Sequence, residues 1–133
     1  MLADKGLVVA LESQARKAIL PVRVQADGVD RYPQDVEATV YFCVLEALQN
    51  VQKYARASEI AVRIHQDVGT LAFEVEDDGT GFDAASVRKG AGLTNMSDRL
   101  DALGGKLEVT SQVGAGTRVR GSLPARPRVA ATV

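Results

Sequence analysis

Two short glycine clusters, separated by a polar segment, constrain the fold of this chain more than any other feature. Gly79-Thr80-Gly81 follows a strand-like run, and Gly90-Ala91-Gly92 precedes a helix-like run. Glycine is favoured where the backbone takes a positive φ or lies close to a ligand. Exposed N–H groups that lead into a helix start form an anion site. Because the carboxylate of Asp77 lies just before the first cluster, residues 77–93 predict a site for a ligand with a base and phosphates, which is a nucleotide.

The apolar pattern on both sides of these clusters predicts an α+β fold. Apolar spacing predicts helices over 3–19, 33–55 and 94–103, and alternation predicts strands over 21–26, 60–64, 71–76, 106–109 and 117–123. A turn at Val68-Gly69 joins two of these strands in a hairpin. This order predicts a two-layer α/β sandwich, in which about three helices cover one face of a mixed, mainly antiparallel sheet.

The same order excludes two common nucleotide-binding folds. A dinucleotide-binding Rossmann unit places its glycines between the first strand and the helix that follows it, whereas Gly79 and Gly81 follow a predicted hairpin. The chain also lacks a GxxxxGK[ST] element, so it is not a P-loop protein.

Composition limits the partners and the location of the chain. A net charge of -1 gives no basic field, so nucleic-acid binding has little support. Cys43, the single cysteine, lies in an apolar run and is expected to be a small core residue in a reducing cytoplasm. His65, the single histidine, is expected at the surface without metal-binding partners. No apolar run approaches the ~20 residues that span a bilayer. We therefore expect a soluble cytoplasmic chain, whose parent protein is either soluble or membrane-bound.

Three polar residues follow the apolar run 40–45 of the central predicted helix. Glu46, Asn50 and Lys53 are spaced by four and three positions, which places them on one helix face. Such a stripe is commonly a solvated face with ordinary contacts between neighbours. In a nucleotide site, however, Asn50 offers a carbonyl oxygen to Mg²⁺ and Lys53 offers a point charge to a phosphate.

Asp77 likewise allows two interpretations, one structural and one functional. It can belong to a plain hairpin turn of sequence DDGTG. It can also accept a hydrogen bond from an exocyclic amine such as that of adenine.

Four motifs in this order resemble the ATP-binding domain of sensor histidine kinases. They are the N box at 46–55 (EALQNVQKYA), the G1 box at 77–82 (DDGTGF), the G2 box at 90–93 (GAGL) and the last glycine box at 114–117 (GAGT). Two further segments, 6–11 and 93–99, resemble the subgroup that works with LuxR-type response regulators. The match covers roughly residues 4–123, so we expect one ATP-binding domain over 1–123 and a disordered tail over 124–133.

The resemblance implies the Bergerat-type fold shared with the Hsp90, gyrase B and MutL ATPases, with ATP and Mg²⁺ as cofactors. It implies that Asn50 is the Mg²⁺ ligand, that Asp77 binds adenine and that Thr117 lies near the adenine. Glu46 is expected to polarise the reacting groups or to orient Mg²⁺, and with Asn50 and Lys53 it forms the expected catalytic set. Further nucleotide contacts are implied for Lys53, Tyr54, Gly79, Gly81, Phe82, Gly90, Gly92 and Leu93.

Three features depart from the family pattern. Tyr54 replaces a histidine common in the subgroup, and Ala91 stands where histidine or tyrosine is frequent. The predicted ATP lid, residues 83–89, is very short. We therefore expect nucleotide binding that is weak or that needs a neighbouring domain.

The resemblance also implies partners outside this chain. No histidine lies in a dimerisation-helix setting, so we expect a monomeric fragment that binds ATP without autophosphorylating. The phosphoacceptor would lie on a separate histidine-containing dimerisation domain, with a LuxR-type response regulator as an indirect partner. Two alternatives are an anti-sigma-type serine kinase and a non-catalytic docking module of the same fold.

Overall fold

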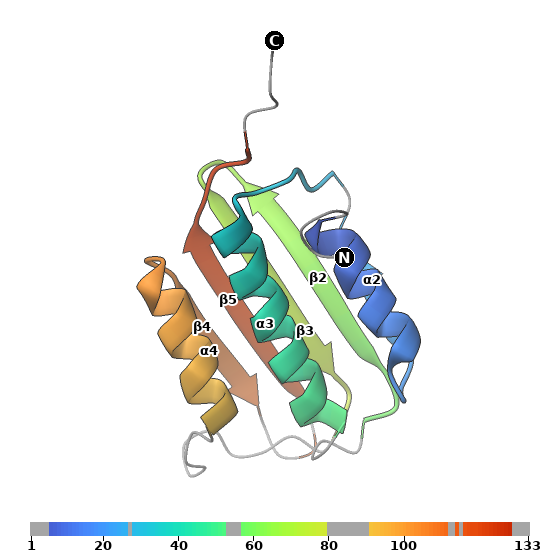
Figure 1. The fold of residues 1–133 in the computed structure, drawn as a ribbon. Helices are drawn as coiled ribbons and strands as arrows, with labels where there is room; N and C mark the ends of the chain where they lie inside the picture. Colours follow the sequence, from blue (N-terminus) through green and yellow to red (C-terminus); the bar gives the residue numbers. More distant parts are fainter. Residues whose placement is uncertain are drawn as a thin grey trace.

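The computed structural model describes residues 6–26, 28–52, 57–79, 91–111, 114 and 116–128, without the side chains of 91 and 92. Its elements follow the predicted order (Figure 1). They are the helices α2 (Leu7–Lys17), α3 (Gln34–Asn50) and α4 (Ala91–Ala102), and the strands β1 (Val22–Gln25), β2 (Ile60–Asp67), β3 (Thr70–Asp77), β4 (Lys106–Ser111) and β5 (Thr117–Pro124).

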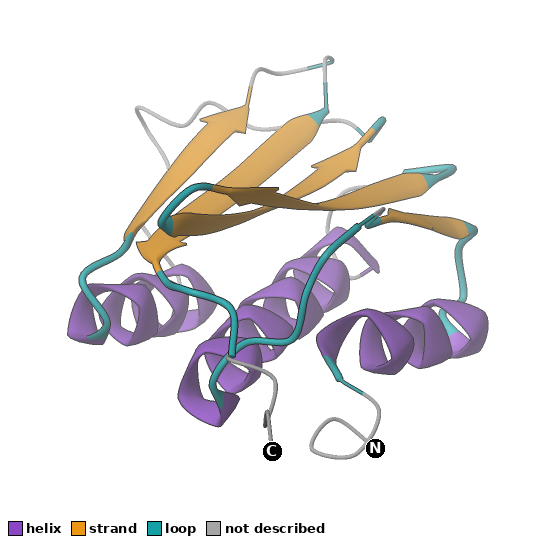
Figure 2. Cartoon of the chain, turned by 90° about the horizontal axis from the view of Figure 1, so that it is seen from above, coloured by secondary structure: helices purple, strands orange, loops and turns teal. Residues whose placement is uncertain are grey.

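One sheet contains all five strands in the order β1-β2-β3-β5-β4. The β1–β2 pair is parallel, and the other three pairs are antiparallel. The three helices lie on one face of this sheet, and the other face carries none of the described helices (Figure 2). The predicted two-layer sandwich with a mixed, mainly antiparallel sheet is therefore confirmed.

The core lies between the sheet and α3. Alternate residues of β3 are buried, as expected for a strand with one face on the core, and they include Phe73 and Val75. Gly121 of β5 makes room for the Phe73 ring, because a Cβ at this glycine would lie 2.3 Å from ring atoms. Cys43 is fully buried on α3, as predicted, and burial raises the pKa of its thiol to about 12. Cys43 is thus an inert core residue.

An ion pair with a buried carboxylate holds the start of α3. Glu37 is 2% exposed, and its carboxylate accepts hydrogen bonds from Nε and Nη2 of Arg31 and from the backbone N–H of Tyr32. The carbonyl of Arg31 in turn accepts from the N–H of Arg128, 2.7 Å away. Gly6 lies against the same arginine, since a Cβ on it would be 2.7 Å from the Arg31 side chain. The first and last described segments of the chain therefore meet at the first turn of α3.

Several predicted boundaries were wrong by a few residues. Helix α2 ends at Lys17 instead of residue 19, because Ala18 is extended with ψ 149°. Pro21 disfavours helical geometry in the residue before it, so the chain leaves the helix early and Ile19 is 88% exposed. Pro33 lies just before α3 instead of inside its first turn.

The ends of α3, α4 and β5 also differ from the predictions. The α-helical part of α3 ends at Asn50, and residues 51–52 continue it as a wider π-type turn, while residues 53–55 of the predicted helix lie outside the described chain. Helix α4 begins at Ala91, three residues before the predicted start at 94. Pro124 belongs to β5 and not to the tail. The N–H of Ala125 donates to the carbonyl of Gly69, and residues 129–133 lie outside the described chain.

None of the described helices combines the length and the apolar character that crossing a membrane requires. His65 is exposed on β2, on the sheet face away from the helices, which agrees with its prediction as a surface residue.

Replacing Glu37 with alanine should lower the free energy of unfolding by about 2 kcal/mol, because it removes charged hydrogen bonds and leaves the Tyr32 amide buried without its acceptor. Urea unfolding at neutral pH measures this change. Glu12→Ala is the control, since this carboxylate is exposed on α2. We expect the control to change stability by less than about 0.5 kcal/mol. Equal losses in the two variants would contradict a structural role for the ion pair.

Candidate functional site

One edge of the molecule gathers the predicted site residues. Helix α3 and strand β3 end at this edge, and helix α4 and strand β5 begin there, at the lower edge in Figure 1. The predicted residues inside the described chain lie on or next to these four ends. They are Glu46, Asn50, Asp77, Gly79, Gly92, Leu93 and Thr117. Lys53, Tyr54, Gly81, Phe82, Gly90 and the lid at 83–89 lie outside the described residues.

Asp77 is the last residue of β3 and is 6% exposed. It continues the buried face of β3 after Phe73 and Val75, so its side chain lies on the helix-covered side of the sheet. Its Oδ1 accepts a hydrogen bond from the N–H of Gly79 at 2.8 Å. This contact alone would fit a plain turn, but a turn does not require a buried carboxylate.

The electrostatics of Asp77 favour a ligand that donates hydrogen bonds. Burial raises the pKa of the Asp77 carboxyl above its ordinary value, and the charges of Asp78 and Glu76 act in the same direction. The backbone amides of Gly79 and Thr117 oppose this shift without cancelling it. The ionised carboxylate therefore has fewer favourable interactions than it would have in water. A donor group such as an exocyclic amine would stabilise it.

The next residue, Asp78, has a different role that the sequence analysis did not assign. It is exposed, and its carboxylate accepts from the hydroxyl of Ser58 and from the backbone N–H groups of Ser58 and Glu59, at 2.8 and 3.1 Å for the two amides. The hydrogen bond from the Ser58 hydroxyl is the main reason that the pKa of Asp78 is lowered. Asp78 thus holds the start of β2 against the end of β3, while Asp77 faces the site.

Strand register places Thr117 next to Asp77. The two residues are directly opposite each other in the β3–β5 ladder, and opposite residues share a sheet face. Gly116, which precedes Thr117, allows this approach: its φ is +81°, and a Cβ there would lie 2.2 Å from the Asp77 carbonyl oxygen. Gly116 lies in the last glycine box but was not among the predicted site residues. The GxGT pattern was the signal that could have identified it.

Glu46 and Asn50 occupy the last turns of α3, and both are partly buried. Within the described part of the chain no side-chain hydrogen bond joins them, so the ordinary i,i+4 side-chain contact does not account for this pair. The π-type turn that follows Asn50 is held by Gln52, whose Oε1 accepts from the N–H of Ile19 at 3.2 Å. Turns of this kind are frequent at functional sites.

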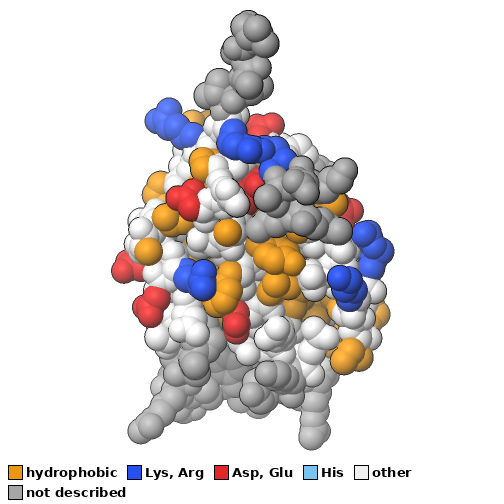
Figure 3. All heavy atoms as spheres, viewed as in Figure 1, with side chains coloured by type: hydrophobic (Ala, Val, Ile, Leu, Met, Phe, Trp, Pro, Cys, Tyr) orange, Lys and Arg blue, Asp and Glu red, His pale blue; other side chains and the backbone are white. Residues whose placement is uncertain are grey.

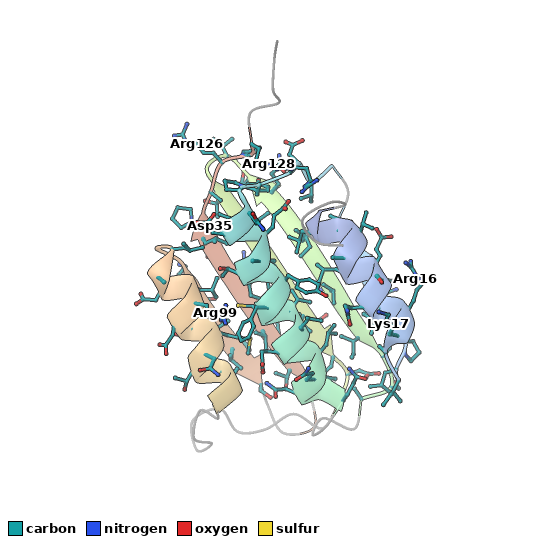
Figure 4. The ribbon with its side chains drawn as sticks, viewed as in Figure 1. Arg16, Lys17, Asp35, Arg99, Arg126 and Arg128 are labelled. Carbon is teal, nitrogen blue, oxygen red and sulfur yellow. The ribbon has the colours of Figure 1, made fainter. Side chains whose placement is uncertain are left out.

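Helix α4 brings its N-terminus to the same edge. Gly92 lies in its first turn, where backbone N–H groups have no partners within the helix and favour an anion. Met96 is fully buried, and its carbonyl lies 3.9 Å from Sγ of Cys43 on α3. The guanidinium of Arg99 lies 3.9 Å from the centroid of the Phe42 ring, between the two helices (Figure 4). These contacts hold α4 against the middle of α3.

A groove of about 510 Å³ opens on the other face of the sheet, and at the site edge its lining includes Asp77, Ser111, Gly116 and Thr117. Two of its arginines already pair across the strands: Arg63 and Arg118 contact Glu76 at 3.5 and 2.6 Å. We therefore place the ligand on the helix side, where the Asp77 carboxylate is buried. The helix-covered face in Figure 3 shows acidic and basic side chains together, without a field of one sign.

Comparison with known proteins identifies the family. Residues 35–127 match the family described as histidine kinase-, DNA gyrase B- and HSP90-like ATPases. The chain belongs to this family. The predicted resemblance is confirmed at the level of the family and its fold.

Relatives and solved structures of this ATPase family agree with the assignment. The chain is 34% identical over 96 residues to the signal transduction histidine-protein kinase/phosphatase DegS of Brevibacillus brevis, a match that covers 71% of this chain and 25% of DegS. It is 40% identical over 131 residues to UhpB of Salmonella typhimurium, named in the same way, covering 94% of this chain and 26% of UhpB. The chain thus spans about a quarter of the length of these relatives.

The structure of a blue-light activated histidine kinase, Erythrobacter litoralis EL346, superposes with a TM-score of 0.76 at 29% identity. The superposition covers 89% of this chain and 41% of that structure.

Asp77→Asn should leave the ligand-free domain at least as stable as wild type at neutral pH. Below the ordinary pKa of aspartate the carboxyl is protonated in both states and contributes nothing to pH dependence. As the pH rises, the unfolded chain ionises first, so stability falls until the folded state reaches its raised pKa. The neutral asparagine avoids this loss.

Thermal unfolding between about pH 3 and pH 7 compares the two proteins. Asp98→Asn, at an exposed position on α4, is the matched control. An Asp77→Asn variant that is less stable than wild type at neutral pH would show that the amide hydrogen bonds outweigh burial.

Proposed function

We propose that this chain is the catalytic ATP-binding domain of a two-component sensor histidine kinase. In this proposal it presents Mg-ATP for transfer of the γ-phosphoryl group to a histidine on a separate dimerisation domain. The observation that carries the proposal is the buried Asp77 carboxylate, which lies beside Thr117 at the edge where α3 ends and α4 begins.

The described residues fit the two ends of the nucleotide. Asp77 and Thr117 would bind the adenine, with Gly79 and Gly116 allowing the backbone to approach it. The start of α4 at Gly92 would receive phosphate oxygens. Leu93 is partly buried and packs against the core, so it would anchor this first turn rather than contact the ligand through a polar group.

Asn50 fits a Mg²⁺ site in which the protein supplies few of the metal ligands. Among the described residues no group of three or more histidine, cysteine or acidic side chains could hold a metal ion. A metal at this edge would therefore take most of its ligands from phosphates and water, as Mg²⁺ does, with the amide oxygen of Asn50 as one protein ligand. Mg²⁺ bound there would neutralise charge on the phosphates, and Glu46, one turn earlier, would orient the metal's water ligands.

The reaction needs a nucleophile in line with the γ-phosphate, and this nucleophile would come from another domain. His65 is not a candidate for this nucleophile, because it is exposed on the open sheet face, away from the helices. It also lies five residues along β2 from Ile60, which is opposite Asp77, or about 16 Å from the site edge. Lys53 and Tyr54, which follow Asn50, complete the proposed nucleotide contacts together with Gly81, Phe82 and Gly90.

The remaining partners follow from the family subgroup. We propose a LuxR-type response regulator as the indirect partner, a monomeric state for this domain and a cytoplasmic location. Similarity to DegS and UhpB, which are signal transduction histidine-protein kinases/phosphatases, supports this setting. An anti-sigma-type serine kinase would instead phosphorylate a partner protein on serine, and a docking module would not bind ATP.

Calorimetric titration with ATP, with and without Mg²⁺, tests the proposed site. Asn50→Ala should remove the dependence of ATP binding on Mg²⁺ and weaken binding in Mg²⁺ by about tenfold or more, which is ~1.4 kcal/mol. Gln49→Ala is the control, because this side chain is exposed at the neighbouring position of α3. Unchanged Mg²⁺-dependent binding by Asn50→Ala would refute the metal assignment. Absence of ATP binding by the wild-type chain joined to its dimerisation domain would favour the docking module.

A further inference from the structure

Ser111 is a buried hydroxyl at the end of β4 that belongs to none of the four sequence motifs. It is directly opposite Thr117 in the β4–β5 ladder, and Thr117 is directly opposite Asp77 in the β3–β5 ladder. The three side chains therefore form a row across three strands on the ligand side of the sheet. Oγ of Ser111 lies 2.8 Å from Oγ1 of Thr117 and 3.2 Å from the carbonyl oxygen of Gly116.

The number of protons fixes the direction of these hydrogen bonds. A serine hydroxyl has one proton to donate, and a backbone carbonyl can only accept. Ser111 therefore donates to Gly116, and in its contact with Thr117 it must accept. The proton of the Thr117 hydroxyl then points to Ser111, and the lone pairs of Oγ1 remain for the ligand.

The carbonyl of Gly116, which accepts the hydrogen bond from Ser111, is held in place. Gly116 has a φ of +81° and lies so close to the backbone of Asp77 that a Cβ would be 2.2 Å from its carbonyl oxygen. Its own carbonyl therefore has little freedom to turn away from Ser111. The ionised Asp77 carboxylate also accepts only. Two hydrogen-bond acceptors thus lie side by side, and the ligand edge that meets them has to donate.

We propose that Ser111 is a positioning residue that sets the polarity of the Thr117 hydroxyl and so makes the site select a 6-amino purine over a 6-oxo purine. The proposal rests on the proposed function, since it concerns the base end of the same nucleotide site. A 6-amino group, or a water molecule bound to it, donates a hydrogen bond to Asp77 or to Thr117. A 6-oxo group presents an acceptor to the same two acceptors, and their repulsion lowers its affinity.

Binding of ATP and ITP tests the proposal, because the two nucleotides share the ribose and the phosphates and differ only in the base, where ATP has a 6-amino group and an acceptor N1 and ITP has a 6-oxo group and an N1–H. Wild type should prefer ATP. Ser111→Ala frees the Thr117 hydroxyl to donate, so we expect the ratio of the two affinities to fall by about tenfold. Ser111→Thr keeps the hydroxyl and should restore most of the preference. Ser122→Ala, at the opposite end of β5, is the matched control.

A double-mutant cycle separates polarity from simple support of the β4–β5 turn. In a Thr117→Val background the hydroxyl is gone, so adding Ser111→Ala should leave the ATP to ITP ratio unchanged. Equal losses of ATP and ITP affinity in Ser111→Ala, with the ratio preserved, would overturn the proposal and leave the ATP site standing. If the wild-type chain joined to its dimerisation domain binds neither nucleotide, the proposed function fails instead, and this proposal fails with it.

Discussion

The register between β3 and β5 is the constraint on which the site depends. It sets Asp77 opposite Thr117 and, through β4, brings Ser111 into the same row. A slip of one residue would move all side chains of a strand to the opposite face and would expose the Asp77 carboxylate on the open side. Two glycines on β5 or just before it enforce the register, because Gly121 accommodates the Phe73 ring and Gly116 accommodates the Asp77 backbone. The core and the ligand site therefore depend on the same pairing.

The two consecutive aspartates show how the fold separates stability from binding. Asp78 is exposed, and hydrogen bonds from Ser58 and Glu59 lower its pKa, so its ionised form suits the folded state. Asp77 is buried, and its raised pKa indicates that its charge is unfavourable in the ligand-free fold. In the proposed site, a donor from the ligand would compensate this unfavourable burial. The proposed binding residue is thus the one whose charge the ligand-free fold disfavours, as is common at functional sites.

The sequence predicted the order of elements and the sheet type, because these depend on local periodicity, and a contiguous motif made Asp77 a candidate site residue. It failed at boundaries such as Ala18 and Ala91, where proline geometry and packing of the following element decide the helix ends. It could not identify Ser111, because that residue joins the site only through the pairing of β4 with β5. The sequence also did not distinguish the roles of Asp77 and Asp78. These roles depend on which face of the sheet each side chain occupies at the end of β3, and on the position of Ser58 beside Asp78.

Helix α3 is fastened at both ends, and this bears on how the domain would work. The Arg31–Glu37 pair ties its first turn to the start and the end of the described chain, and Gln52 ties its last turn to the loop after α2. The proposed metal ligand Asn50 is therefore held on a rigid element. Such an element fixes the position of the bound phosphates and does not change shape to fit them. In the proposed kinase the acceptor histidine arrives from another domain, so ATP affinity and transfer rate would be separate quantities. The first depends on the row from Asp77 to Ser111, and the second on the neighbouring domain that supplies the nucleophile.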